Sequence, residues 1–230
     1  MFFDILTLFP GMFEGAFSDS IIKRAVEKQL ISINIRNIRD FSHDKKHNSV
    51  DDYPYGGDAG MLLRPEPITN SIKESKKSLV GCNPKVVYLT PSGERLNQNI
   101  VKSFLGEKSL ILLCGRYKGV DQRVIDHYVD REISIGDYVL SGGEVPAMVL
   151  LDAITRLIPG VLGNLDSAQE DSFYGGLLSH PQYTRPEYFE DMKVPDVLLS
   201  GNHAKIRQWQ QRKAMEITQQ RRPDLLNEGN

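Results

Sequence analysis

The sequence is short of the features that mark several protein classes. It has two cysteines, Cys82 and Cys114, and they form neither a CxxC pair nor a metal-ligand spacing. We therefore expect no structural metal and predict two reduced, partly buried thiols in a cytoplasmic protein. No uncharged run approaches the roughly 20 residues that span a bilayer, so no membrane partner is expected.

The chain also lacks a strong charge of either sign. It carries 28 basic and 30 acidic side chains, for a net charge of −2, so any basic surface must be local. The apolar start MFFDILTLFPGMF is interrupted by Asp4 and Pro10 and follows no basic segment, which predicts a buried strand and not a signal peptide. Neither GxGxxG nor a P-loop motif is present, which argues against a nucleotide-binding oxidoreductase or a nucleoside-triphosphate fold.

Apolar runs alternate with helical patterns along most of the chain. Strands are expected over residues 2–8, 31–38, 85–90, 110–114 and 132–135. Helices are expected over residues 18–30, with Ser18 as the N-cap, and over 65–77, 96–105, 120–128 and 144–157. This alternation predicts an α/β domain with a mostly parallel sheet flanked by helices.

Glycine-rich segments follow three of these strands. They are residues 89–93, 115–119 and 135–143. Glycine lets a ligand approach the backbone closely, and ligands of parallel sheets bind at the carboxyl ends of the strands. The segment ISIGDYVLSGGEVP suits a flat heterocycle better than a phosphate, although a tight strand-to-helix connection without a ligand stays an alternative.

The polar segment 39–60 separates two of the expected elements. A loop of this length in a compact domain is usually functional or mobile. His43 and His47 are four residues apart, but no third metal ligand is obvious, so a solvated loop that touches a polar substrate is favoured.

The last third of the chain changes in character. Segment 159–183 is irregular and holds Asp166, Glu170 and Asp171, and a solvated linker is its simplest interpretation. Segment 203–222 has six basic side chains against Glu216, a local charge of +5, around Trp209. A basic helix with an aromatic residue indicates contact with a nucleic-acid backbone, although an exposed helix with Trp209 packed inward is the alternative.

Eight motifs, in order from Met1 to about Leu226, resemble the bacterial tRNA (guanine-37-N1)-methyltransferases. They are LFPGMF (8–13), RDFSHDKKHNSVDDYPYGG (39–57), CGRYKGVDQRVID (114–126), SIGDYVLSGGE (134–144), IPGVLG (158–163), EDSF (170–173), HPQYTRP (180–186) and VPDVLLSGNHAKI (194–206). The resemblance implies the knotted SPOUT-class fold, in which the sheet domain ends in a deep C-terminal trefoil knot. It further implies a knotted cofactor-binding domain at 1–161, a mobile linker at 162–180 and a small helical tRNA-binding domain at 181–230.

The resemblance also implies the chemistry and its residues. S-adenosylmethionine donates a methyl group to N1 of guanine 37 in tRNA, and Mg²⁺ is possible. Asp171 is the expected base and Arg156 the expected partner of O6, with Asp52, Arg185, Lys205 and Arg207 on the RNA. From the residues alone, Asp171 could be one linker acid among three and Arg156 a charge that suits a helix end.

The expected cofactor ligands are in the three glycine-rich segments. They are Tyr88, Leu89, Pro91, Gly115, Tyr117, Gly119, Ile135, Gly136, Asp137, Tyr138, Val139, Leu140, Gly142, Gly143 and Pro146. The resemblance places this pocket at the subunit interface of a homodimer. Two positions depart from the family pattern: Lys118 stands in place of glutamate and Asp58 in place of glycine. Competing readings are a knotted methyltransferase of ribosomal RNA and an RNA-binding module without catalysis.

Overall fold

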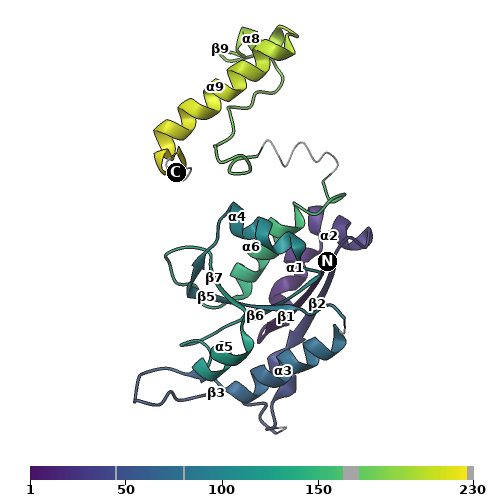
Figure 1. The fold of residues 1–230 in the computed structure, drawn as a ribbon, viewed down its shortest axis with the longest axis vertical. Helices are drawn as coiled ribbons and strands as arrows, with labels where there is room; N and C mark the ends of the chain where they lie inside the picture. The colour runs from purple at the N-terminus through teal and green to yellow at the C-terminus, as the bar shows by residue number, and fades with distance from the viewer. Residues whose placement is uncertain (45, 80, 163–170, 227–230) are drawn as a thin grey trace. The chain divides into compact units, whose positions relative to one another are not determined.

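The computed structural model describes residues 1–44, 46–79, 81–162 and 171–226 (Figure 1). The chain divides into two compact units, Met1–Gly163 and Asn164–Asn230. The first unit holds the main sheet, and the described residues of the second include an irregular segment, one short hairpin and helices. The acids Asp166 and Glu170 of the expected linker lie outside the described residues.

A five-stranded parallel sheet forms the centre of the first unit. Its strand order is β2-β1-β6-β5-β7, and every neighbouring pair is parallel. The strands are β1 (Phe2–Thr7), β2 (Ser32–Asn37), β5 (Lys85–Arg95), β6 (Ser109–Cys114) and β7 (Arg131–Ser134). The mostly parallel α/β sheet predicted from the sequence is therefore confirmed. Strand β6 is buried throughout, as its unbroken apolar sequence predicted.

Helices cover both faces of this sheet (Figure 1). On one face lie α1 (Glu14–Phe17), α2 (Ser20–Glu27), α4 (Gln98–Ser103) and α6 (Glu144–Thr155), and on the other lie α3 (Pro65–Ser78) and α5 (Gln122–Tyr128). Alternate residues of each strand enter the two cores: Leu110 and Leu112 join the core beneath α6, whereas Ile111 and Leu113 join the core beneath α3. This is the period-two alternation of strand side chains.

Two boundaries expected from the sequence are wrong. Helix α2 begins at Ser20, with Asp19 at the N-cap position, because the chain first turns at Ser18, whose hydroxyl donates to the Gly15 carbonyl at 3.1 Å. Strand β5 does not end at Thr90 but runs to Arg95. The register with β7 shifts between Leu89 and Glu94, and this irregularity lets the strand pass Pro91 and pair again.

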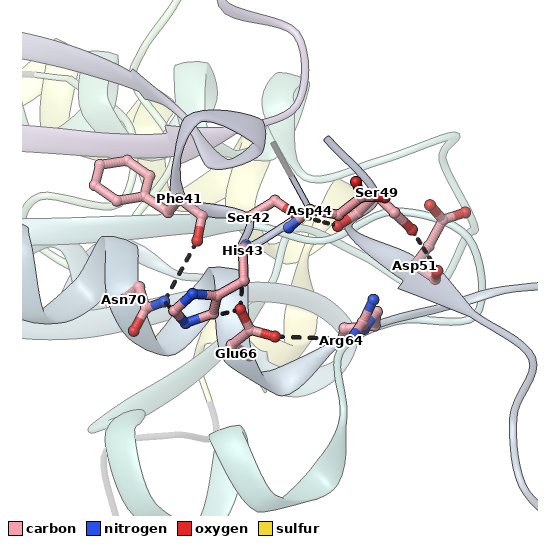
Figure 2. A network of polar contacts seen from close by, with 9 residues as sticks. All are labelled: Phe41, Ser42, His43, Asp44, Ser49, Asp51, Arg64, Glu66 and Asn70. Carbon is pink, nitrogen blue, oxygen red and sulfur yellow. Dashed lines mark hydrogen bonds and ion pairs between the residues drawn. The ribbon is translucent and has the colours of Figure 1, made fainter. Parts of the chain in front are cut away.

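The long polar segment is more ordered than expected. It contains a 3₁₀ turn, η2 (Ile38–Phe41), and strand β3 (Asp51–Asp52), which pairs antiparallel with β4 (Leu62–Leu63). Figure 2 shows Glu66, in the first turn of α3, accepting a hydrogen bond from the backbone N–H of His43 at 3.2 Å. The same carboxylate oxygen lies 3.0 Å from Nε2 of the His43 ring. This contact fixes the start of the segment to α3.

Histidines of the segment therefore have carboxylate partners. His47 Nδ1 lies 3.3 Å from Asp44 Oδ2, and hydrogen bonds from the backbone of His47 and Lys46 lower the pKa of Asp44. Within the described residues, no group of three or more histidines, cysteines or acids could hold a metal ion.

The second unit is built around α9 (His203–Arg221). Before it come the hairpin of β8 (Tyr188–Phe189) and β9 (Met192–Lys193), and then α8 (Asp196–Leu199); η4 (Pro223–Leu226) follows it. Asn202 caps α9 by accepting the Lys205 N–H at 3.1 Å. Trp209 is half-buried against His180 and Tyr183, whereas the nearby cations Lys205 and Arg207 are exposed. No described helix is long and apolar enough to cross a membrane.

Candidate active site

A cavity of about 280 Å³ lies beside the irregular part of β5 that follows Leu89 and the carboxyl ends of β6 and β7. The three glycine-rich segments form its wall, because the carboxyl ends of parallel strands meet at one edge of a sheet. Every expected cofactor ligand except Asp137 lines the cavity. The Asp137 side chain instead lies 3.7 Å from Arg95 and is 84% exposed. Six lining residues were not among the expected ligands. Thr90, Arg116, Lys118 and Ser141 lie within the glycine-rich segments, whereas Ile133 and Ser134 lie just before the third segment.

Glycines bring two walls of the cavity together. The Gly143 N–H donates to the Gly115 carbonyl at 2.9 Å, which joins the segment after β7 to the segment after β6. A Cβ at Gly143 would lie 2.7 Å from Cys114 Cα, and one at Gly115 would lie 2.8 Å from the Tyr88 hydroxyl. These positions therefore need glycine, because a side chain would fill part of the cavity or push the two segments apart.

A buried polar cluster supports the cavity from below. The Glu144 side chain, which is 1% exposed, accepts a hydrogen bond from the Thr7 hydroxyl at 2.8 Å. Arg116 Nε lies 3.3 Å from the other Glu144 oxygen, as an ion pair without hydrogen-bond geometry. The Arg116 guanidinium also lies over the Phe9 ring, 4.4 Å from its centre. The cluster joins the start of α6 to β1 and to the wall of the cavity.

Two titratable groups near the cavity stay neutral at ordinary pH. Burial raises the pKa of the Tyr88 phenol, and a hydrogen bond with Thr90 partly offsets this effect. Cys114 is fully buried, which corrects the expectation of a partly buried thiol. Burial, and then the nearby Glu144 carboxylate, raise the pKa of the Cys114 thiol well above its usual value. Cys114 is therefore a packed thiol beneath the cavity and not a nucleophile.

Two expected site residues of the first unit, Arg156 and Asp52, do not line this cavity. Arg156 is exposed at the C-terminal end of α6, whereas Pro146 at the other end of the helix lines the cavity. Ten residues of α-helix span about 15 Å, so an Arg156 side chain of the same copy does not line this wall. Asp52 is exposed on β3.

Asp171 belongs to the second unit. It lines a separate cavity of about 420 Å³ beside the middle of α9, together with His180, Arg207 and Gln210. This cavity brings the expected base and one expected RNA contact together. The other expected RNA contacts, Arg185 and Lys205, are exposed in the same unit.

The fold and the site define a class: α/β proteins with a small-molecule cavity at the carboxyl edge of a parallel sheet and a separate unit that carries a basic helix. Within it, the chain belongs to the family described as tRNA (Guanine-1)-methyltransferase TrmD, whose family model matches residues 1–228. The resemblance seen in the sequence is thus confirmed.

Individual relatives match this chain over nearly their whole length. The tRNA (guanine-N(1)-)-methyltransferase of Dictyoglomus turgidum is 54% identical over 223 residues, which cover 97% of this chain and 89% of the relative. The protein of the same name from Clostridioides difficile is 52% identical over 230 residues, covering 100% and 99%. The one from Bacillus cereus strain B4264 is 53% identical over 225 residues, covering 98% and 91%.

Membership in a methyltransferase family implies the use of S-adenosylmethionine. The cavity suits such a group, because its volume is near the lower end of small-molecule sites, roughly 300 Å³. Its wall combines apolar side chains such as Leu89, Ile133 and Val139 with backbone groups that glycines leave accessible.

Proposed function

We propose that this protein transfers a methyl group from S-adenosylmethionine to N1 of guanine 37 in tRNA, next to the anticodon. The observation that carries the proposal is the cavity itself. Three segments far apart in the sequence join at one edge of the sheet to form it, in a chain that matches the methyltransferase family along its length.

The cavity residues would bind and orient the cofactor. Backbone groups of residues 135–140 would pair with the edge of the adenine ring, and Leu89 and Pro146 would cover its faces. Gly115 and Gly143 would let the bent molecule approach the backbone. Bound there, S-adenosylmethionine supplies an activated methyl group and needs no metal for that activation, so a role for Mg²⁺ would be to organise the tRNA.

The base and the charge partner come from the chain. Guanine N1 carries a proton and is a poor nucleophile until that proton leaves, so a base is needed beside it. Asp171 is our proposed base; a free aspartate has a pKa of about 3.9, so it must be held close to N1 to be effective. Arg156 would donate to O6, where negative charge builds as the proton leaves.

The position of Arg156 supports a homodimer with the active site at the subunit interface. Since Arg156 lies at the far end of α6 from the cavity, a second copy could supply it. Exposed apolar side chains near the cavity fit such an interface: Val139 is 83% exposed, and Val145 and Val149 form one exposed stripe of α6. Helix spacing places residues four apart on the same face.

Family membership also supports the finer features that we propose. These are the C-terminal trefoil knot, the division into 1–161, 162–180 and 181–230, the contacts of Asp52, Arg185, Lys205 and Arg207 with tRNA, and a cytoplasmic location. The exposure of the three cations is compatible with binding a phosphate backbone.

The test is methyl transfer to two unmodified tRNA transcripts that differ at position 37. Labelled S-adenosylmethionine should modify the transcript with guanine there, at N1, and leave the transcript with adenine unlabelled. Equal labelling of both transcripts would contradict the assignment of the target. Label on neither, together with label on ribosomal RNA, would support a different knotted methyltransferase.

Asp171→Asn should separate binding from chemistry. We expect methyl transfer to fall about 10²- to 10⁴-fold, the usual contribution of a general base, with the affinity for S-adenosylmethionine unchanged. Single-turnover transfer and calorimetric titration measure the two quantities. Asp191→Asn is the matched control, because Asp191 is an exposed acid of the same unit outside the Asp171 cavity. Full activity of Asp171→Asn would exclude Asp171 as the base.

A further inference from the structure

The charged side chains on the wall of the small-molecule cavity are both cationic. Among the described residues, Arg116 and Lys118 line it and no carboxylate does. The expected acid, Asp137, faces Arg95 instead. The cavity is therefore a positively charged site, whereas the proposed methyl donor carries a positive sulfonium.

The two cations differ in how far their charge is neutralised. Arg116 pairs with the buried Glu144 carboxylate and lies over the Phe9 ring. For the Lys118 ammonium, the described part of the chain provides no ion pair and no hydrogen bond. Lys118 is thus the lining cation whose charge no protein group in the described residues neutralises.

The backbone holds Lys118 at this wall. Its N–H donates to the Met61 carbonyl at 2.9 Å, and the neighbouring Gly119 carbonyl accepts the Leu63 N–H at 3.0 Å. The lysine stem runs across Gly60, where a Cβ would lie 3.2 Å from Lys118 Cγ. Gly60 has a φ of +106°, so the chain passes closely under the lysine in a conformation that favours glycine.

We propose that Lys118 sets the relative affinity of the cavity for S-adenosylmethionine and for its demethylated product, S-adenosylhomocysteine. The two molecules share every group except the methyl, and the product has a neutral thioether where the donor has a sulfonium. Lys118 lines the cavity of about 280 Å³ that would hold the sulfur, and charges closer than the Debye length, about 8 Å at physiological salt, still interact. The Lys118 charge weakens binding of the donor and leaves binding of the product nearly unchanged. This inference rests on the proposed function.

The test is the ratio of the two affinities, measured by calorimetry on the full chain. Relative to the unaltered protein, Lys118→Gln should raise the affinity for S-adenosylmethionine over S-adenosylhomocysteine about threefold, and Lys118→Glu about tenfold, as expected for a change of one and of two unit charges acting across roughly 8 Å in a water-like dielectric. Raising the salt to about 1 M should remove most of the difference, because the Debye length falls to about 3 Å.

Lys108→Glu is the matched control. Lys108 is exposed just before the start of β6, seven residues from Gly115, so the same charge change lies about 20 Å away and is screened. The ratio should stay that of the unaltered protein.

Three results would overturn the inference in distinguishable ways. An unchanged ratio with both ligands still bound would show that the Lys118 charge does not reach the sulfur, and the proposed function would survive. A parallel loss of both ligands would place Lys118 on a group that they share. Failure of the unaltered protein to bind either ligand would overturn the proposed function as well. If Lys118→Glu does not fold, Lys118→Gln decides alone.

Discussion

Gly143 shows how much a single missing side chain contributes to the cavity. A Cβ there would meet Cys114 Cα at 2.7 Å, and Cys114 ends a strand that is buried throughout. Because this backbone cannot move aside, Gly143→Ala should separate the segments after β6 and β7. We expect at least a tenfold loss of affinity for S-adenosylmethionine and a loss of about 1–3 kcal/mol in the free energy of unfolding. Calorimetry and urea unfolding measure these effects.

Gly15→Ala is the control for that substitution. Gly15 lies in α1 with no atom within 4 Å of an added Cβ, so alanine fits there without strain. Binding should be unaffected, and stability should rise by about 0.4–1 kcal/mol because alanine restricts the unfolded chain. Equal binding by Gly143→Ala would show that the close approach of the two segments is not needed.

At the scale of one element, helix α5 depends on its N-cap. The Asp121 carboxylate accepts the backbone N–H of Arg123 at 3.0 Å and pairs with its guanidinium at 2.8 Å. The side-chain hydrogen bond from Arg123 is the main cause of a lowered pKa at Asp121. Asp121→Ala should therefore lower the free energy of unfolding by about 1 kcal/mol at pH 7, the usual cost of losing a cap.

The pH dependence follows from the direction of that shift. A carboxyl group whose folded pKa is depressed stabilises the fold above its unfolded value, near 3.8, and this contribution is lost as pH falls through the lower folded value. Asp121→Asn keeps a capping oxygen but has no charge, so it should lie between the aspartate and alanine forms at pH 7. Denaturant unfolding from pH 7 down to pH 3 should show the gap between aspartate and asparagine closing. A constant gap would mean that the charge contributes nothing.

At the scale of the whole molecule, the two units can be followed separately. Trp209 is the single tryptophan of the sequence, and the rings packed against it, His180 and Tyr183, belong to the same unit. Its fluorescence therefore reports the second unit, whereas far-ultraviolet circular dichroism also includes the sheet. A ligand that binds only the folded first unit stabilises that unit by about 2.7 kcal/mol when its concentration is about 100 times its Kd.

We therefore expect S-adenosylmethionine to raise the unfolding temperature of the sheet without moving the Trp209 transition. Addition of tRNA should change the Trp209 emission at once. Trp209→Phe is the control, since it keeps an aromatic ring and removes the signal. Equal shifts of both transitions with S-adenosylmethionine would show that the two units unfold together.

Much of the cavity could be predicted from the sequence. Its segments carry glycines and follow apolar strands, and parallel strands end at a common edge, so the loops at 89–93, 115–119 and 135–143 were expected to meet. The exception was Asp137, because a list of loop residues does not say which way each side chain points. The role of each lining residue toward a cofactor stays a prediction.

The support beneath the cavity could not be predicted. Thr7 and Glu144 are 137 residues apart, and their hydrogen bond exists only because α6 packs across the start of the chain. The extension of β5 past Pro91 has a similar origin. It depends on pairing with β7, whereas the local proline and glycine indicate a turn.

The sequence by itself determined the alternation of strands and helices, the buried central strand, the basic helix around Trp209 and the family. Those properties depend on the spacing of residues that are near neighbours in the sequence, or on the order of motifs along it. Both can be read without knowing how the chain folds. Only the tertiary structure decided which charges line the cavity and which groups pair with the Glu144 carboxylate. It also decided that Arg156 lies a helix length away from the cavity. Such facts depend on contacts between residues far apart in the sequence, and packing alone selects those contacts.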